Sequence, residues 1–240
     1  MKSLKKWVFE RGIQMEVKER LAHQSNYTKG RKQPVQYIVV HYTANNGDTA
    51  QGNGNYFAQA NRNASAHYFV DENSIIQSVK DNDTAWHCGA KSYRHEKCRN
   101  NNSIGVEMCS EKDQNGQYYI NQETQNTAIA VVKMLMEKYN IPLKNVLRHY
   151  DVTGKMCPEP FVRNQVQWLD FKQKLTEQKE VQEEMVYNYI DENMPDWAKP
   201  TVQKLIAKGA LKGDEKGQLM LTGTMLRLFV IHDRIGVYDK

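Results

Sequence analysis

The sequence predicts an α/β fold in which helices cover a mixed central β-sheet, followed by a small C-terminal helical domain. The segment 36–42 is apolar on both faces, as a strand covered by helices on both sides should be. Further strand-like and helical segments alternate along the chain, which favours a sheet packed between helices. The charged segment 176–184 separates this part from a shorter one with a helical pattern.

The segments between the central strand and residue 110 are short. Their patterns predict a helix near 54–62 and strands at 66–71, 75–79 and 103–109. In the last of these strands Ile104, Val106 and Met108 alternate with small or polar residues. The strand therefore has one apolar face and one face on which polar side chains can gather.

A long helix and a closing helix complete the predicted α/β domain. The long helix runs from about Gln122 to Tyr139; Asn121 opens it and Asn140-Ile-Pro142 ends it. A strand at 145–149 follows. The closing helix runs from Phe161 to about Leu175, and its apolar residues at helical spacing are Val162, Val166, Trp168, Leu169, Phe171 and Leu175.

The predicted domain boundaries follow the change in composition. Residues 1–178 form the α/β domain, residues 179–190 a polar linker, and residues 191–240 a small helical module. Within the module, Asp196 is expected to cap one helix and Thr222 a second.

Three residues that are distant in the sequence have the types and positions of metal ligands. His41 and His149 each end a predicted strand, and Cys157 follows in a loop after Gly154. Open α/β sheets place their sites beyond strand ends, so these side chains can meet. Two imidazoles and a thiolate would leave one tetrahedral position of a zinc ion open, which is typical of catalytic zinc. Each residue alone is more often a core residue than a ligand.

Five motifs follow one another along the chain, of which the first contains His41 and the last contains His149 and Cys157. They are Tyr37-Ile-Val-Val-His-Tyr-Thr-Ala-Asn45, Ser65-Ala-His-Tyr-Phe-Val-Asp71, Thr84-Ala-Trp-His-Cys-Gly89, Asn102-Ser-Ile-Gly-Val-Glu107 and Arg148-His-Tyr-Asp-Val-Thr-Gly-Lys-Met-Cys-Pro158. Over roughly residues 15 to 175 the chain resembles the type-2 N-acetylmuramoyl-L-alanine amidases, zinc hydrolases that share a fold with peptidoglycan recognition proteins. The resemblance implies bound zinc, that fold, and cleavage of the amide between N-acetylmuramic acid and L-alanine, causing lysis of the bacterial cell wall.

The resemblance also implies two catalytic residues. Glu107 matches the catalytic carboxylate of bacterial members, although a lone glutamate on a strand is otherwise an exposed carboxylate. Some phage relatives use a tyrosine where this chain has Ala66, so Glu107 must act alone, with Tyr68 as a weaker substitute. Lys155 matches the family's catalytic lysine and is expected to stabilise an oxyanion.

Four residues are predicted to bind substrate. Thr43 follows the first ligand and faces the expected groove. Trp86 and His87 match a family segment that lines the groove for the stem peptide, although core packing is the alternative for Trp86. His67 either orients substrate or hydrogen-bonds within the sheet.

Charge and cysteine content limit the partners and the compartment. The net charge is +5, with no basic run interleaved with aromatics, so nucleic acid is not an expected partner. The resemblance implies bacterial peptidoglycan as the partner. Neither a transmembrane segment nor a signal peptide is recognised. We therefore expect a lysin made in the cytoplasm that acts on the wall after release, as in phage lysis. Reduced thiols are favoured there, although a bridge among Cys88, Cys98 and Cys109 stays open.

Alternatives remain for the activity and for the C-terminal module. A non-catalytic peptidoglycan-binding protein of the same fold is one rival, and a zinc peptidase that cuts within the stem peptide is another. The module resembles the small helical modules of clostridial and phage wall hydrolases, which implies wall binding; homodimerisation or support of folding is the alternative. Target species, stem-peptide preference, phage or bacterial origin and oligomeric state stay open.

Overall fold

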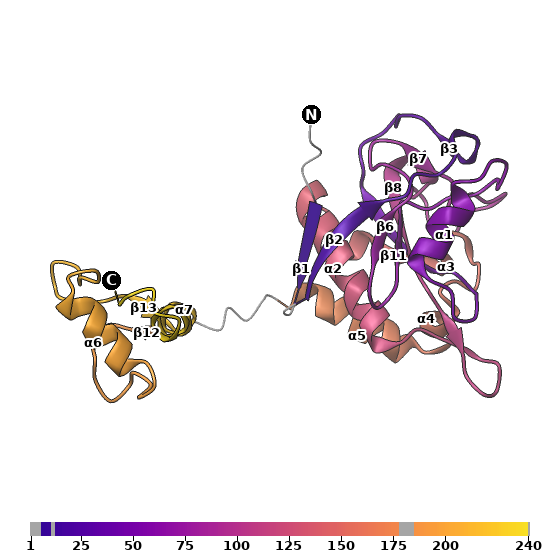
Figure 1. Ribbon diagram of the computed structural model, residues 1–240. Coiled ribbons are helices and arrows are strands. Elements are labelled where there is room, and N and C mark those ends of the chain that lie inside the picture. Colours follow the sequence, from indigo (N-terminus) through magenta and orange to yellow (C-terminus); the bar gives the residue numbers. More distant parts are fainter. Residues whose placement is uncertain (1–5, 11–12, 178–184, 240) are drawn as a thin grey trace. The chain divides into compact units, whose positions relative to one another are not determined.

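The computed structural model describes residues 6–10, 13–177 and 185–239 (Figure 1). The chain divides into two compact units, Met1–Gln178 and Lys179–Lys240. Each unit has its own cluster of buried apolar residues. Among the described residues, no helix is long and apolar enough to cross a membrane.

The first unit is built on a seven-stranded mixed sheet, which confirms the predicted fold class. In spatial order the strands are β1 (Lys6–Glu10), β2 (Ile13–Glu19), β6 (Ile75–Gln77), β5 (Tyr68–Val70), β8 (Ser103–Met108), β4 (Tyr37–Tyr42) and β11 (Val146–Arg148). Strands β5, β8, β4 and β11 run parallel to their neighbours in this series. β1 and β2 pair antiparallel, as do β5 and β6. The β1–β2 pair was not predicted.

The remaining elements of the first unit surround this sheet. The helices are α1 (Ala50–Phe57), α2 (Gln122–Tyr139), α3 (His149–Thr153), α4 (Glu159–Arg163) and α5 (Gln165–Thr176). Short 3-10 turns lie at Gln24–Asn26, Asn100–Asn102 and Leu143–Asn145. Two small ribbons pair β3 (Tyr27–Thr28) with β7 (Thr84–Ala85), and β9 (Glu111–Lys112) with β10 (Tyr118–Tyr119).

The two faces of the sheet have different roles. On one face, α2 packs against β8, β4 and β5, and α5 packs on α2 (Figure 1). Ile38 and Val40 of β4 and Val106 of β8 belong to the main core on this face. The alternate residues of the same strands, including His41 and Glu107, point to the opposite face. Polar side chains such as these therefore lie on one face of the sheet, and the other face is apolar.

Helix α1 begins earlier than predicted. The pattern placed a helix near 54–62, whereas α1 spans Ala50–Phe57. Thr49 starts it, because its side chain accepts a hydrogen bond from the Gly52 N–H at 3.1 Å. At Gly54 an added Cβ would lie 2.9 Å from a methyl carbon of Ile76. This glycine weakens the helical pattern of the sequence but permits close packing on the sheet.

The closing helix is divided in two. The helix is interrupted at Asn164, which lies between α4 and α5. The Asn164 side chain accepts hydrogen bonds from the N–H groups of Val166 and Gln167. Trp168, Phe171 and Leu175 are buried as predicted, while Val166 is 74% exposed and Leu169 57% exposed. The apolar stripe is therefore narrower than the sequence pattern indicated.

The long helix has the predicted bounds. The Asn121 side chain accepts a hydrogen bond from the Thr124 N–H, and Asn140 ends the helix in the left-handed conformation with φ 51°. Near its end, Lys138 Nζ and the Tyr139 hydroxyl donate to Asp81 at 2.7 and 2.8 Å. These bonds tie the helix to the loop after β6.

The second unit is small. Its elements are β12 (Val186–Tyr187), α6 (Lys199–Ala207), β13 (Leu221–Thr222) and α7 (Gly223–Arg234). The buried residues between them are Met194, Ala198, Val202, Leu221, Leu226 and Val230. Residues 179–184 of the predicted linker 179–190 lie outside the described residues, and the remainder is not a linker throughout, because β12 pairs with β13. Thr222 caps α7 as predicted, whereas the Asp196 side chain accepts from Lys199 Nζ instead of capping α6.

Candidate metal centre

The three predicted ligands converge at one edge of the sheet. His41 lies near the end of β4, and His149 is the first residue of α3, directly after β11. Because β4 and β11 are parallel neighbours, their carboxyl ends meet at this edge. Gly154 ends α3 with φ +88°, a conformation that favours glycine, and the chain then returns Cys157 to the two histidines.

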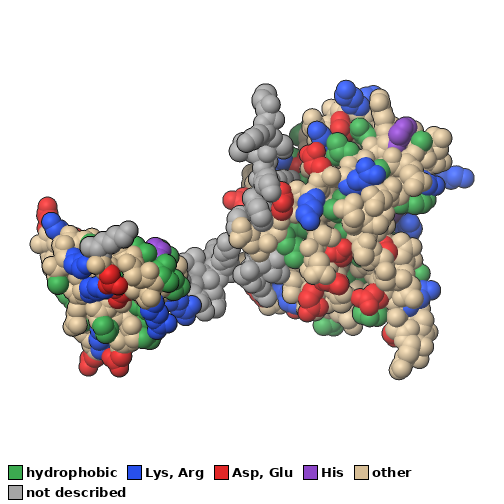
Figure 2. All heavy atoms as spheres, viewed as in Figure 1, with side chains coloured by type: hydrophobic (Ala, Val, Ile, Leu, Met, Phe, Trp, Pro, Cys, Tyr) green, Lys and Arg blue, Asp and Glu red, His purple; other side chains and the backbone are tan. Residues whose placement is uncertain are grey.

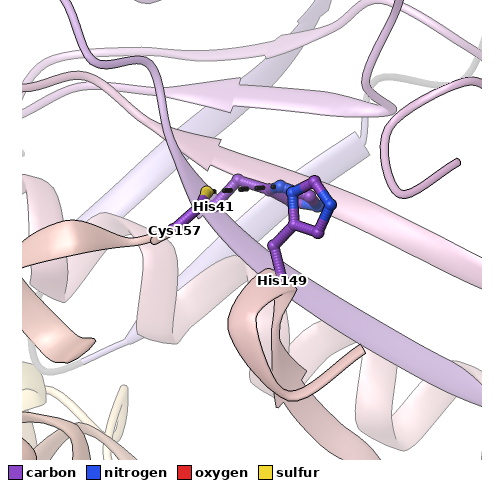
Figure 3. Close-up of side chains that lie close together, drawn as sticks. All are labelled: His41, His149 and Cys157. Atoms are coloured by element: carbon purple, nitrogen blue, oxygen red, sulfur yellow. Dashed lines mark hydrogen bonds between the residues drawn. The ribbon is translucent and has the colours of Figure 1, made fainter. Parts of the chain in front are cut away.

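The geometry suits a metal ion bound by three side chains. One ligand atom from each of His41, His149 and Cys157 can be chosen so that all lie within 4.8 Å of one another. Cys157 Sγ is 3.7 Å from His41 Nδ1, and the two imidazole centroids are 4.7 Å apart. Figure 3 shows the three side chains pointing toward a common point.

The electrostatics of these groups favour a bound cation. Burial lowers the pKa of His41 well below its usual value and that of His149 to about 4, so both imidazoles are neutral and offer lone pairs. His149 Nδ1 is buried and has no hydrogen-bond partner among the described residues. Such an orphaned nitrogen is costly unless a ligand uses it. Burial raises the pKa of the Cys157 thiol, which a bound divalent cation would ionise.

Glu107 lies beside the ligand cluster. It is opposite His41 in the β4–β8 register, and its Oε1 is 3.8 Å from His41 Nδ1. Its Oε2 is buried and has no hydrogen-bond partner among the described residues. Burial raises the pKa of Glu107 to about 8, although the positive charge of Lys155 opposes this. The carboxyl group is therefore available to exchange protons near neutral pH.

Two cavities flank the cluster, and Lys155 lines both. One, of about 620 Å³, is lined by residues that include Thr43, Tyr56, Glu107 and Cys157. The other, of about 510 Å³, is lined by residues that include Trp86, His87, Lys91 and His149. Cys157 lines the larger cavity and His149 the smaller one, so the cluster can be reached from both.

Three of the four predicted substrate residues line these cavities. Thr43 lines the larger one, and Trp86 and His87 line the smaller one. The structure places His67 elsewhere: it is fully buried, its Nδ1 accepts from the Gly105 N–H at 3.0 Å, and its Nε2 is 2.6 Å from Arg31 Nη2. This is the predicted alternative, hydrogen bonding within the sheet, and it leaves no ring nitrogen for a substrate. Tyr68 is buried too, and its hydroxyl donates to Asp81 rather than reaching the site.

Asp48, a carboxylate on the wall of the larger cavity, was not predicted as a site residue. Its Oδ1 accepts from Thr43 Oγ1 at 3.0 Å, and its Oδ2 accepts from Asn53 at 2.6 Å. These bonds hold the loop that follows β4. Thr49 as a helix cap was the available signal, because it places Asp48 just before α1 and next to the site.

Basic side chains do not gather into a single patch on the visible face of the first unit. In Figure 2, Lys and Arg lie among Asp and Glu on that face. The arrangement fits an ordinary solvated surface better than an extended track for a polyanion.

The fold and the site together define an α/β protein in which three side chains form a cluster that could hold a metal ion. Residues 31–160 match the family described as N-acetylmuramoyl-L-alanine amidase. The chain belongs to this family, which confirms the resemblance seen in the sequence motifs.

Relatives and solved structures agree with this assignment. The chain is 36% identical over 150 residues to the N-acetylmuramoyl-L-alanine amidase CwlL of Bacillus licheniformis, which covers 59% of this chain and 41% of the relative. It is 33% identical over 200 residues to the amidase BlyA of Bacillus subtilis strain 168, with 78% and 51% covered. The chain thus spans about half the length of these curated relatives.

The structure of PlyL is similar over 68% of this chain and 98% of PlyL, with 33% identity and a TM-score of 0.57. The catalytic domain of XlyA is similar over 66% of this chain and 98% of that domain, with 28% identity and a TM-score of 0.56. These matches support the fold of the first unit, to which the metal centre belongs.

Proposed function

We propose that the chain is a zinc-dependent N-acetylmuramoyl-L-alanine amidase, which hydrolyses the amide between N-acetylmuramic acid and L-alanine in bacterial peptidoglycan. The observation that carries this proposal is the convergence of His41, His149 and Cys157 within 4.8 Å in a chain of the amidase family. Two imidazoles and a thiolate suit zinc. Three protein ligands rather than four leave a position for a reactant, which supports hydrolysis over a structural role.

The residues around the ligands can supply the remaining chemistry. Zinc, when bound, polarises a carbonyl and makes water more acidic. Glu107 is the general base that takes a proton from the attacking water and then delivers it to the leaving amine. Its position 3.8 Å from His41 Nδ1 puts it at the edge of the ligand cluster. Lys155, on the wall of both cavities, stabilises the negative charge that develops on the carbonyl oxygen.

Two rival functions use the same fold or the same metal. A non-catalytic peptidoglycan-binding protein does not need a base, yet this chain keeps Glu107 beside the ligands. A zinc peptidase acting within the stem peptide would use similar chemistry, so the bond that is cleaved must distinguish it. The family match favours the amidase.

Mass spectrometry of digested peptidoglycan, with and without a zinc chelator, tests the proposal. The expected products are intact glycan chains and free stem peptides with a new N-terminal alanine, and chelation should abolish them. New termini inside the peptide would identify the peptidase. Sedimentation of the chain with walls without cleavage would identify the binding protein.

We also propose a role for the second unit and a place where the chain acts. We ascribe to the second unit either binding of the wall polymer or formation of a homodimer, because it has a core of its own. The chain would be made in the cytoplasm and act on the wall after release, as in phage lysis. Centrifuging the digestion mixture and measuring the molecular mass of the chain alone separates the two roles of the second unit.

Lys155→Met is expected to lower turnover by roughly 10²–10³-fold, because one stabilising group for the oxyanion is lost. Zinc content should be unchanged, since Lys155 is exposed and is not one of the three ligands. The measurement is kcat on purified peptidoglycan beside metal analysis. Lys174→Met, in which the lysine lies on α5 and pairs with Asp170, is the matched control and should keep full turnover. Unchanged turnover of Lys155→Met would remove this residue from the mechanism.

A further inference from the structure

A chain of hydrogen bonds leads away from His41 through Nε2, whereas Cys157 and Glu107 face its other ring nitrogen, Nδ1. His41 Nε2 lies 3.0 Å from His87 Nδ1. His87 Nε2 lies 3.1 Å from the Ser103 hydroxyl, and that hydroxyl lies 2.7 Å from the backbone carbonyl of Arg99. His41, His87 and Ser103 are all buried. Each bond in this chain is therefore shielded from competing water.

The last acceptor fixes the direction of every bond. A carbonyl can only accept, so the Ser103 hydroxyl donates to Arg99 and must accept from His87 Nε2–H. When the His87 imidazole is neutral, its one ring proton lies on Nε2, so its Nδ1 accepts from His41 Nε2–H. His41 is then unprotonated at Nδ1, the atom that faces Cys157 and Glu107. This is the tautomer that a metal ligand needs.

The ring of His87 is held in place by the backbone around it. A Cβ at Gly105 would lie 2.6 Å from His87 Cγ and 2.8 Å from its Nδ1, so the ring rests directly on β8. The N–H groups of His87 and Cys88 both donate to the Asn100 side chain, at 3.2 and 2.8 Å. Both the ring and its backbone therefore have one favoured position.

We propose that His87 is a positioning residue that fixes the tautomer and orientation of His41, and so prepares the site for its metal. This role differs from the substrate contact predicted from the sequence, because both His87 nitrogens are engaged with protein atoms. Partners that hydrogen-bond the second nitrogen of a ligating histidine typically change metal affinity by about 10–100-fold. The inference rests on the metal-binding part of the proposed function, and not on the identity of the substrate.

Zinc affinity of the full chain, measured by competition with a chelator at one pH, tests the proposal in three variants. His87→Ala should lower affinity by about 10–100-fold. His87→Asn should restore it to within a few-fold, because Asn Oδ1 can accept where His Nδ1 did. His87→Gln carries its amide farther along the side chain and should behave like alanine. If glutamine restored zinc affinity as well as asparagine does, the side chain would only fill space, and the proposal would be overturned. Wild-type zinc affinity in His87→Ala would also overturn it.

The tautomer of His41 can be measured without any variant. Nitrogen NMR of the zinc-free wild-type chain with labelled histidine should show His41 protonated at Nε2 and unprotonated at Nδ1. The opposite tautomer would overturn the proposal even if His87→Ala failed to fold. A wild-type chain that shows this tautomer but takes up no zinc would instead contradict the proposed function.

Discussion

Replacement of Cys157 by serine is expected to lower zinc affinity by roughly 10²–10³-fold. The guide is the binding free energy of structural zinc in zinc-finger peptides, about 10–16 kcal/mol, divided equally among four ligands. Cys157 is 3% exposed, and its thiol is the sulfur ligand of the cluster. A serine hydroxyl is a poorer zinc ligand than cysteine, because zinc prefers the soft thiolate and deprotonates a coordinating thiol outright. Amidase turnover should fall below detection at ordinary zinc concentrations.

A second buried cysteine provides the control for this experiment. Cys109 is also a free thiol and is 5% exposed, but it is not part of the ligand cluster. Cys109→Ser should therefore keep its zinc and its activity. Metal analysis after dialysis, followed by titration with added zinc, measures both variants. A Cys157→Ser chain that retained wild-type zinc affinity would contradict the assignment of the metal centre.

The ligand set could be predicted from the sequence because it depends on local patterns. His41 follows an apolar strand, His149 follows another, and Cys157 lies a few residues after a glycine turn. The five ordered motifs and their resemblance to the amidases joined these residues into one site, and the parallel pairing of β4 and β11 shows how the strand ends meet. The alternation of β8 placed Glu107 on the face with small and polar residues, but its catalytic role was predicted from the resemblance of Ser103-Ile-Gly-Val-Glu107 to the amidase motif.

The parts that could not be predicted depend on residues distant in the sequence. His67 was ambiguous because its orientation is set by Arg31, which lies 36 positions earlier in the chain. The pair β1–β2 reaches the sheet through β6, so no local pattern shows where β2 belongs. The role of His87 required Ser103 and the Arg99 carbonyl to be seen together. For His67 a contact in the folded state decided between two interpretations, whereas the β1–β2 pair and the role of His87 depend on contacts that the sequence did not indicate.

Replacement of Glu107 by glutamine is expected to separate metal binding from catalysis. Loss of a general base costs roughly 10²–10⁴-fold in turnover. Zinc binding should persist, because Glu107 is not one of the three ligands and glutamine keeps its shape. The measurements are kcat on peptidoglycan and zinc content of the same preparation. Glu137→Gln, an exposed carboxylate on α2, should have wild-type turnover.

The thermal stability of the zinc-free Glu107→Gln variant tests whether Glu107 is protonated in the folded wild type. Burial raises the pKa of Glu107 from 4.5 to about 8, so the folded wild type holds a proton that the unfolded chain releases. Wild-type stability from this group is therefore complete below pH 4.5 and is lost as the pH rises toward 8. Glutamine does not ionise, so the variant should unfold at a higher temperature than wild type, by a margin that grows across this range. If the variant loses activity but the difference in unfolding temperature between the two proteins does not change with pH, Glu107 is ionised in the zinc-free wild type. The carboxylate would then already be a base before zinc binds, rather than a group whose proton the bound metal displaces.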